Sequence, residues 1–316
     1  MKIIGTGSAI PRRKVTNEML TEFLETSDEW ISTRTGIKSR RVLSTDEDVT
    51  QLAIKASEEA LKDAHLDATE LDYIICHNVD NDYKTPALAC VIQGAIKAKC
   101  PCVDMNGACA GFIFSLDCAN GLMKAGRAKK ILVVCAEHMT KLTDWTRRES
   151  CVLFGDGAGA VILTDEGPDC EISLSTVSNS DALYCNAGVK ETPFSHQEKK
   201  YDKLTMKGKE VFKFAVQSSS HDIQQVMDKA KVTADDVSYF VLHQANLRIV
   251  DAIRTYMNQT EEKFPHNIER RGNTSSASVP LLLDEMNKNG QLKEGDIVVF
   301  SAFGAGFSSG ACLMRW

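Results

Sequence analysis

Two stretches of the chain, DYIICH at residues 72–77 and SYFVLH at residues 238–243, share four apolar residues followed by a histidine. The residues before them also match in character at the same offset of 166 positions, from residue 60 onward, without a gap. Each copy has apolar residues three and four apart, then a short turn and an apolar run, which indicates an amphipathic helix followed by a buried strand. We therefore predict that the chain uses one helix–strand unit twice.

A second pair of similar segments closes each copy, FGDGAGAVIL at residues 154–163 and FGAGFSSGACLM at residues 303–314. Apolar runs precede and end both, which predicts a strand, a glycine-rich turn and another strand. Alternating helices and apolar strands favour an α/β fold with two similar sheets. We place the two halves at residues 1–165 and 166–316 and expect the active site where they meet.

The composition of the 316-residue chain excludes several classes of protein. Hydrophobic residues make up 43% and charged residues 25%, which is ordinary globular usage, and the net charge of −6 argues against a nucleic-acid partner. No run approaches 18 consecutive apolar residues, and the N-terminal residues lack a signal-peptide pattern. We expect a soluble cytoplasmic protein with neither nucleic acid nor membrane as a partner.

The 11 cysteines include no CxxC pair and no zinc-type spacing, so we expect no metal site. Most lie in apolar runs, and we expect them, Cys118 among them, to be buried small hydrophobes in a reducing compartment. GTGSAI at residues 5–10 lacks the third glycine of a dinucleotide fingerprint. A nucleotide cofactor is therefore not expected there.

Cys109 differs from the other cysteines because it lies in NGACAGF, residues 106–112. The small residues suit a sharp strand-to-helix turn and leave room for a substrate to approach. A cysteine at a helix N-terminus is favoured as a thiolate. The residues alone leave two interpretations open, a nucleophile or a core cysteine at a tight turn.

A histidine and an asparagine could complete a site with Cys109. His243 follows an apolar strand, so we expect it at the carboxyl end of a sheet, where α/β proteins bind ligands. His77 holds the duplicate position and is interpreted as a structural histidine. Asn273 lies in GNTSSASVP, residues 272–280, which alone is typical of a turn with an N-cap. Together the three supply a Cys–His–Asn set.

With these residues the chain resembles the β-ketoacyl-acyl-carrier-protein synthase III family of the thiolase superfamily. The matching motifs span almost the whole chain in the family's order: GTGSAIP, ETSDEWISTRTGI at 25–37, GACAGF at 107–112, FGDGAGAVIL, EVFKFAV at 210–216, HQANLRI at 243–249, GNTSSASVP and FGAGF at 303–307. The resemblance implies two thiolase-like βαβαβαββ halves in a five-layered αβαβα sandwich. It also implies a homodimer, with the cysteine in the N-terminal half and the histidine and asparagine in the C-terminal half.

The resemblance implies a decarboxylative Claisen condensation that initiates type II fatty-acid synthesis. Cys109 would take the acyl group from an acyl-CoA primer, and malonyl-acyl-carrier protein would then lose CO₂. His243 and Asn273 would stabilise the enolate, and the amides of Cys109 and Ala305 would form the oxyanion hole. The product would be β-ketoacyl-acyl-carrier protein. No separate cofactor is expected, since the CoA thioester is a substrate.

The family also assigns residues that bind the acyl-CoA. The adenine would lie between Trp30 and Arg148, with Arg34 near the pyrophosphate or ribose, because an indole face and a guanidinium plane can sandwich a base. Thr85 and Phe303 would belong to the acyl pocket. Thr85 stands where acetyl-specific members carry a phenylalanine that reaches into the partner subunit. The smaller side chain predicts a primer longer or bulkier than acetyl.

Carrier-protein docking is assigned to a basic patch of Lys213, Arg248 and Arg254, since the carrier is acidic. Thr255 and Tyr256 replace the lysines that family members usually have after this patch. The strength of docking is therefore open.

Three other functions compete with this one. A specialised relative would use a longer, branched or aromatic acyl-CoA with the same three residues. A non-catalytic binding protein would have no need of all three, and a cysteine hydrolase does not fit the duplicated architecture.

Overall fold

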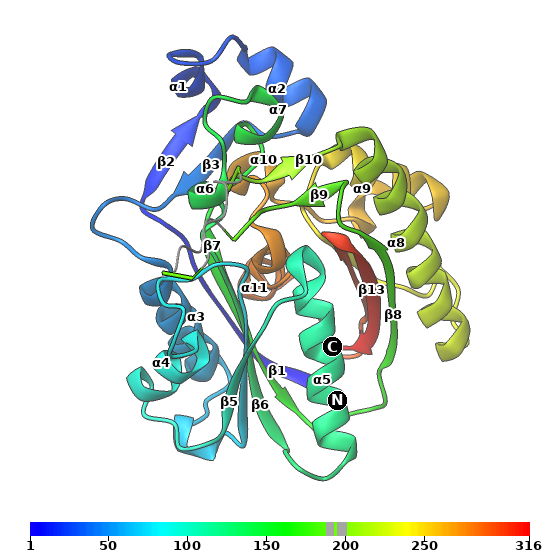
Figure 1. Ribbon diagram of the computed structural model, residues 1–316. Helices are drawn as coiled ribbons and strands as arrows, with labels where there is room; N and C mark the ends of the chain where they lie inside the picture. The colour runs from blue at the N-terminus through cyan, green and yellow to red at the C-terminus, as the bar shows by residue number, and fades with distance from the viewer. Residues whose placement is uncertain (188–192, 195–200) are drawn as a thin grey trace.

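The computed structural model describes residues 1–187, 193–194 and 201–316, which form five layers in the order helix, sheet, helix, sheet, helix (Figure 1). Each sheet and the helices on its outer face come from one half of the chain, and two helices lie between the sheets. The predicted fold class is confirmed.

The first sheet has five strands and is built before residue 165. Their order across the sheet is β1 (Lys2–Ala9), β7 (Gly157–Thr164), β6 (Lys130–Glu137), β4 (Tyr73–His77) and β5 (Cys102–Met105). β4 pairs in parallel with β5 and β6, whereas β7 pairs antiparallel with β6 and β1. Every residue of β7 is buried, because helices cover both faces of the sheet.

The second sheet repeats this plan with one difference. Its order is β11 (Tyr239–Leu242), β12 (Ile297–Gly304), β13 (Gly306–Arg315) and β8 (Glu171–Asn179). Within the described residues it has four strands, where five follow from the βαβαβαββ pattern. The missing edge strand would correspond to β5. The chain there runs through Pro265, which has no N–H to donate to a ladder.

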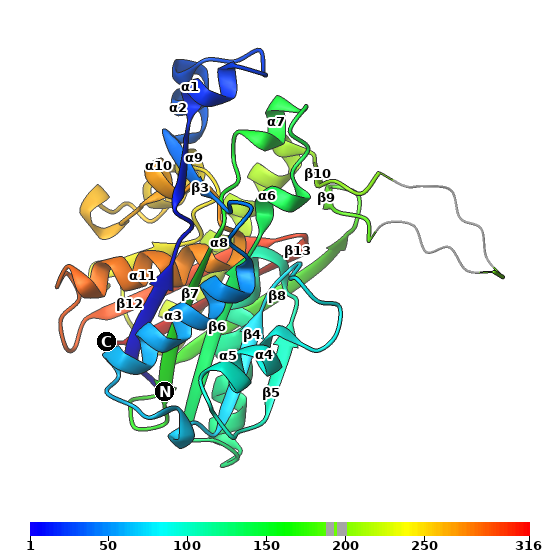
Figure 2. The same cartoon turned by 90° about the vertical axis from the view of Figure 1, so that its left-hand side faces the viewer.

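The helices of the two predicted helix–strand units lie in the outer layers. α3 (Val49–Asp63) precedes β4 and α8 (Gly208–Ala230) precedes β11, and each helix covers the outer face of its own sheet (Figures 1 and 2). α4 (Leu88–Ala95) packs beside α3, and α9 (Leu247–Tyr256) packs beside α8. The duplication read from the sequence is therefore present in three dimensions.

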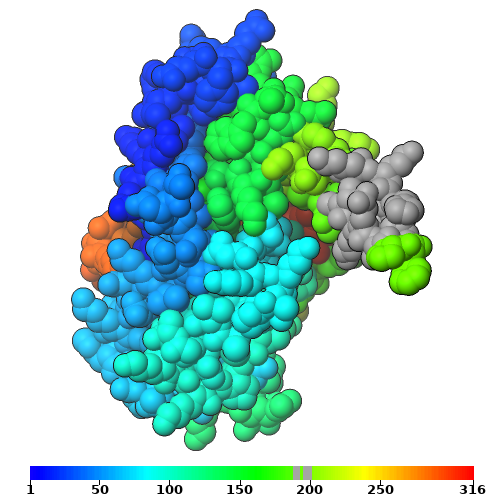
Figure 3. All heavy atoms as spheres, turned by 60° about the vertical axis from the view of Figure 1, so that its left-hand side comes forward, coloured from blue at the N-terminus to red at the C-terminus, as the bar shows by residue number. Residues whose placement is uncertain are grey.

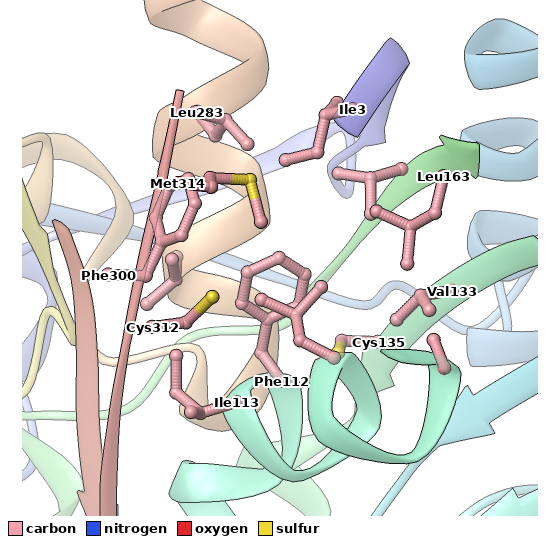
Figure 4. Packing of buried hydrophobic residues seen from close by; sticks show 14 of the residues in the cluster. Ile3, Phe112, Ile113, Val133, Cys135, Leu163, Leu283, Phe300, Cys312 and Met314 are labelled. Atoms are coloured by element: carbon pink, nitrogen blue, oxygen red, sulfur yellow. The ribbon is translucent and has the colours of Figure 1, made fainter. Parts of the chain in front are cut away.

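The middle layer consists of α5 (Gly111–Lys124) and α11 (Ser278–Lys288), which contact both sheets. Phe112 of α5 meets Phe300 of β12 edge to face at 6.0 Å, and Figure 4 shows both among apolar side chains from the two halves. Cys135 and Cys312 are buried in this core as expected. Cys118 was expected to be buried and is exposed, because the buried residues of α5 lie on another face of that helix.

Short elements cover the end of the sandwich near the carboxyl end of β4 (Figure 2). They are α1 (Asn17–Thr21), α2 (Asp28–Thr35), α6 (Met139–Leu142), α7 (Arg148–Cys151), α10 (Ile268–Arg271), the hairpin of β2 (Arg13–Thr16) with β3 (Ser39–Val42), and the pair β9 (Leu183–Tyr184) with β10 (Thr205–Met206). A separate apolar cluster, which includes Ile31, Ile37 and Phe154, holds several of them together. Helix α2, which carries Trp30 and Arg34, contacts α1 and α9.

Candidate active site

One cavity of about 590 Å³ is lined by residues of both halves, including the three predicted to carry the chemistry. Cys109 lies in the 3₁₀ turn Ala108–Ala110 that leads into α5, and His243 follows β11 directly. Asn273 lies between α10 and a second 3₁₀ turn, Ser275–Ala277. Residues far apart in the sequence thus meet at the predicted place.

The backbone around Cys109 is tightly constrained. Ala108 has φ of +50°, a left-handed conformation that is costly for a residue with a Cβ. A Cβ on Gly304 would lie 2.6 Å from the Cys109 nitrogen, so only glycine lets the second half approach so closely. The Ser275 hydroxyl donates to Cys109 Sγ at 3.3 Å. Burial raises the pKa of the Cys109 thiol to about 12, while the Ser275 hydrogen bond acts to lower it.

His243 is held by its backbone and by one ring nitrogen. Its N–H donates to the Ser301 carbonyl at 2.8 Å, which continues the β11–β12 pairing. Nδ1 lies 2.7 Å from Ser278 Oγ, and the Phe303 ring meets the imidazole edge to face at 5.2 Å. Nε2 has no hydrogen-bond partner among the described residues. Burial lowers the pKa of His243 to about 3, so the ring is neutral near pH 7.

Asn273 is anchored to the first half of the chain. Its N–H donates to the Leu153 carbonyl at 2.8 Å, and its own carbonyl accepts from the Gly155 N–H at 3.0 Å. A Cβ on Gly155 would lie 2.4 Å from the Arg271 carbonyl oxygen, so glycine permits this approach. The side-chain Oδ1 accepts from the Ser275 N–H at 2.8 Å. The amide nitrogen is therefore the side-chain group left to donate.

The three residues predicted to bind CoA also lie together. The Ser27 side chain caps α2 by accepting from the Trp30 N–H at 3.0 Å, and Gly36 ends the helix with φ of +80°. The Arg148 guanidinium lies 4.4 Å from the centre of the Trp30 ring, and that of Arg34 lies 4.9 Å from it. Both cations thus contact the indole, and Trp30 and Arg34 line the cavity.

Comparison with known proteins identifies the family. A family model described as 3-oxoacyl-[acyl-carrier-protein] synthase III matches residues 103–182, and the model of its C-terminal part matches residues 227–316. The β-ketoacyl-[acyl-carrier-protein] synthase III of Clostridium acetobutylicum is 42% identical over 321 residues, which cover 100% of this chain and 98% of that protein. The chain belongs to the β-ketoacyl-[acyl-carrier-protein] synthase III family.

Solved structures support the same assignment for this synthase III chain. The 3-oxoacyl-[acyl-carrier-protein] synthase III of Aquifex aeolicus superposes with a TM-score of 0.92 at 40% identity, covering 100% of this chain and 99% of that one. The enzyme of Thermus thermophilus gives 0.93 at 38% identity with the same coverage. The chain is thus an acyltransferase of the initiating condensation of fatty-acid synthesis, as predicted, and the specialised alternative is not favoured.

Of the remaining residues predicted for the synthase III site, some line the cavity and others do not. Ala305 and Phe303 line the cavity. Thr85 is exposed and does not line this cavity, so its place in a partner subunit's acyl pocket stays a prediction. Lys213 and Arg248 are exposed on α8 and α9, each next to a cavity-lining residue.

Arg254, the third residue of the predicted basic patch, is half-buried. Its Nε lies 3.5 Å from Asp251 Oδ1, one turn earlier on α9. The carboxylate offsets part of the positive charge that the synthase III patch would offer to an acidic carrier.

Sequence reasoning missed four residues of the synthase III site, namely Ser275, Ser276, Ser278 and Glu137. The serines lie within GNTSSASVP, which was interpreted for its asparagine alone. Ser275 and Ser276 contact segments more than 100 residues away, as in the 2.6 Å hydrogen bond from Ser276 to Glu137, and Ser278 contacts His243, 35 residues away. No local pattern signals such a contact.

The described part of the chain contains no group of three or more His, Cys, Asp or Glu side chains that could hold a metal ion. Among the helices of that part, none has the length and apolarity needed to cross a bilayer.

Proposed function

We propose that Cys109 is the nucleophile of this synthase III and that acyl-CoA is its first substrate. The thiol sulfur attacks the thioester carbon, an acyl–sulfur bond forms, and CoA leaves as its thiol with the proton from Cys109. The amides of Cys109 and Ala305 donate to the developing oxyanion. The observation that carries the proposal is that Cys109, His243 and Asn273 line one cavity beside Trp30 and Arg34.

The second substrate is malonyl-acyl-carrier protein. Breaking the bond between its carboxyl carbon and the neighbouring CH₂ carbon releases CO₂ and leaves the electron pair on the thioester as an enolate. His243 Nε2 and the Asn273 amide stabilise this enolate by donating hydrogen bonds to its oxygen. The enolate attacks the acyl-cysteine, forms the new carbon–carbon bond and expels the Cys109 thiolate, which regains a proton. The neutral state of His243 supports this role, since a neutral donor needs no proton uptake. No cofactor takes part.

Carrier docking is assigned to the exposed basic residues beside the cavity. Lys213 is next in sequence to Phe212, and Arg248 is next to Ile249; both Phe212 and Ile249 line the cavity. A carrier bound to these basic residues would place its prosthetic arm at the opening of that cavity. Arg254 contributes less because of Asp251.

The acyl pocket is proposed to accept primers longer or bulkier than acetyl. Apolar side chains such as Val79, Met139 and Leu183 line the cavity together with Cys109. Each further buried CH₂ group of a primer contributes about 0.8 kcal/mol. Rejection of every four- to ten-carbon acyl-CoA, with good turnover of acetyl-CoA, would contradict this proposal.

A homodimer in the cytoplasm is proposed as the working form. Among the described strands β5 pairs with β4 alone, so its other edge is unpaired there, and Val103 of that strand is 40% exposed. The cyan residues near position 100 lie together at the surface in Figure 3. An open strand edge of this kind is suited to pairing with a second copy. Light scattering at micromolar concentration would show twice the chain mass.

The reaction is tested by intact-protein mass after mixing wild type and Cys109→Ala with acetyl-, butyryl-, isobutyryl-, octanoyl- and benzoyl-CoA. An adduct that needs Cys109 and disappears on adding malonyl-acyl-carrier protein, with a β-ketoacyl product, is the expected result. Free acid without that product would identify a hydrolase. If none of the five acyl-CoAs forms an adduct with the wild type, the proposal is wrong.

A further inference from the structure

A chain of hydrogen bonds runs beneath Cys109 and includes none of Cys109, His243 and Asn273. The Gly107 N–H donates to His77 Nε2 at 2.7 Å, and His77 Nδ1 lies 2.8 Å from Ser276 Oγ. Ser276 Oγ is 2.6 Å from Glu137 Oε1, and the Val79 N–H donates to Oε2 of the same carboxylate at 3.1 Å. His77 and Glu137 are both fully buried. The chain therefore joins the loop before Cys109 to a buried acid on β6.

The direction of these bonds follows from their donors. A backbone N–H can donate only to an unprotonated ring nitrogen, so His77 carries its proton on Nδ1. That Nδ1–H donates to Ser276 Oγ and also lies 3.4 Å from Glu137 Oε1, and the Ser276 hydroxyl donates to the same carboxylate oxygen. Every polar group of the three side chains named here thus has a role, and the ring is fixed in one orientation.

His77 also packs directly against the start of α5. A Cβ placed on Gly111 would lie 1.9 Å from His77 Cδ2 and 2.0 Å from Nε2. The ring therefore contacts the residues on both sides of Cys109, Gly107 through a hydrogen bond and Gly111 through packing. Between them lies Ala108 in its left-handed conformation, φ +50°. Such a conformation persists only where its surroundings hold it.

We propose that His77 is a positioning residue for the nucleophile: by binding the Gly107 N–H, with Ser276 and Glu137 behind it, it holds Ala108 and Cys109 in the reactive geometry. The inference rests on the proposed role of Cys109. It assigns a task in the acyl-transfer step to a residue that does not reach the substrate. The decarboxylation groups, His243 and Asn273, lie outside this chain of bonds.

Two variants of His77 distinguish the roles of its two ring nitrogens. In His77→Asn the amide occupies the place of Nδ1, so the contact with Ser276 is kept and the acceptor for Gly107 is lost. In His77→Gln the amide reaches the place of Nε2, so the Gly107 acceptor is kept. The two are matched in polarity, and both remove ring volume. Rates of Cys109 acylation by acyl-CoA and of CO₂ release from malonyl-acyl-carrier protein are measured for each, together with thermal unfolding.

We expect His77→Asn to acylate Cys109 about tenfold to 100-fold more slowly than wild type, since a shift of about 1 Å can cost that much. His77→Gln should stay within about threefold of wild type, and CO₂ release should stay within about twofold in both. Equal acylation by the two variants, or a parallel loss of both half-reactions, would overturn the proposal.

Two further measurements keep the outcome decisive. If His77→Asn does not fold, Ser276→Ala, which removes only the link behind the ring, should slow acylation and spare CO₂ release. If wild type itself is not acylated, the proposed function is wrong. The positioning role is then tested by comparing the rates at which iodoacetamide alkylates Cys109 in the two variants. Slower alkylation of His77→Asn than of His77→Gln supports the positioning role, and equal rates overturn it.

Discussion

His77 and His243 occupy equivalent places in the two halves, and the Nδ1 atom of each lies beside a serine hydroxyl, Ser276 at 2.8 Å and Ser278 at 2.7 Å. His77 accepts the Gly107 N–H at Nε2 and is therefore protonated on Nδ1. Ser278 Oγ accepts the Gln244 N–H at 3.2 Å and lies 2.7 Å from His243 Nδ1; when the Ser278 hydroxyl donates to Nδ1, the His243 ring proton is on Nε2. One histidine thus contacts the nucleophile turn, and the other lines the cavity with an unpartnered Nε2.

Replacing Ser278 by alanine should slow release of CO₂ from malonyl-acyl-carrier protein about tenfold, because a buried hydrogen bond of about 1.4 kcal/mol that holds His243 Nε2 in its donor form is lost. Acylation of Cys109 should change little. Ser278→Thr keeps a hydroxyl and serves as the control. Wild-type CO₂ release by Ser278→Ala would show that this serine does not govern His243.

The alkylation rate of Cys109 should rise about tenfold per pH unit from pH 7 to pH 9, because burial raises the pKa of its thiol to about 12 and the thiolate is a minor species throughout. Ser275→Ala removes the hydrogen bond that lowers this pKa, so it should be slower at each pH. The rates are followed with iodoacetamide and mass spectrometry. A plateau below pH 9 would contradict the raised pKa.

Acid should destabilise the fold through His243, whose pKa burial lowers to about 3. Below about pH 6.5 the unfolded chain binds a proton that the folded His243 does not, so the free energy of unfolding falls by about 1.4 kcal/mol per pH unit toward pH 3. Urea unfolding of wild type and His243→Gln at pH 6.5 and pH 5 isolates this effect. Parallel losses in the two proteins would assign the acid sensitivity to other groups.

Trp30→Ala should raise the KM for acyl-CoA about tenfold and leave the iodoacetamide rate of Cys109 unchanged, since stacking on an aromatic face contributes about 1–3 kcal/mol per base. Trp30→Phe keeps a smaller aromatic face, so its KM for acyl-CoA should lie between those of wild type and Trp30→Ala. A wild-type KM for Trp30→Ala would exclude the indole from CoA binding.

Asp251→Asn should lower the KM for malonyl-acyl-carrier protein about twofold to threefold at low salt, because it removes the carboxylate 3.5 Å from Arg254. The gain should vanish at high salt, where exposed charges are screened. The KM for acyl-CoA is the internal control. An unchanged carrier KM at low salt would place docking away from Arg254.

Local patterns predicted much of this molecule and failed where contacts are long-range. The β4 and β11 strands and the turns at Cys109 and Asn273 follow from apolar runs and small residues that lie next to each other in sequence. Glu137, by contrast, meets Ser276 across 139 positions, and neither residue belongs to a pattern of its own. Likewise, the exposure of Cys118 depends on which face of α5 packs between the sheets.

The four residues 275–278 contact both halves of the chain. Ser275 reaches Cys109, Ser276 reaches His77 and Glu137, and Ser278 reaches His243. A single short turn therefore supplies contacts to residues of both half-reactions. Substitutions there are expected to be non-additive with changes in the residues that they contact, and a shift of this turn's backbone would disturb both half-reactions at once.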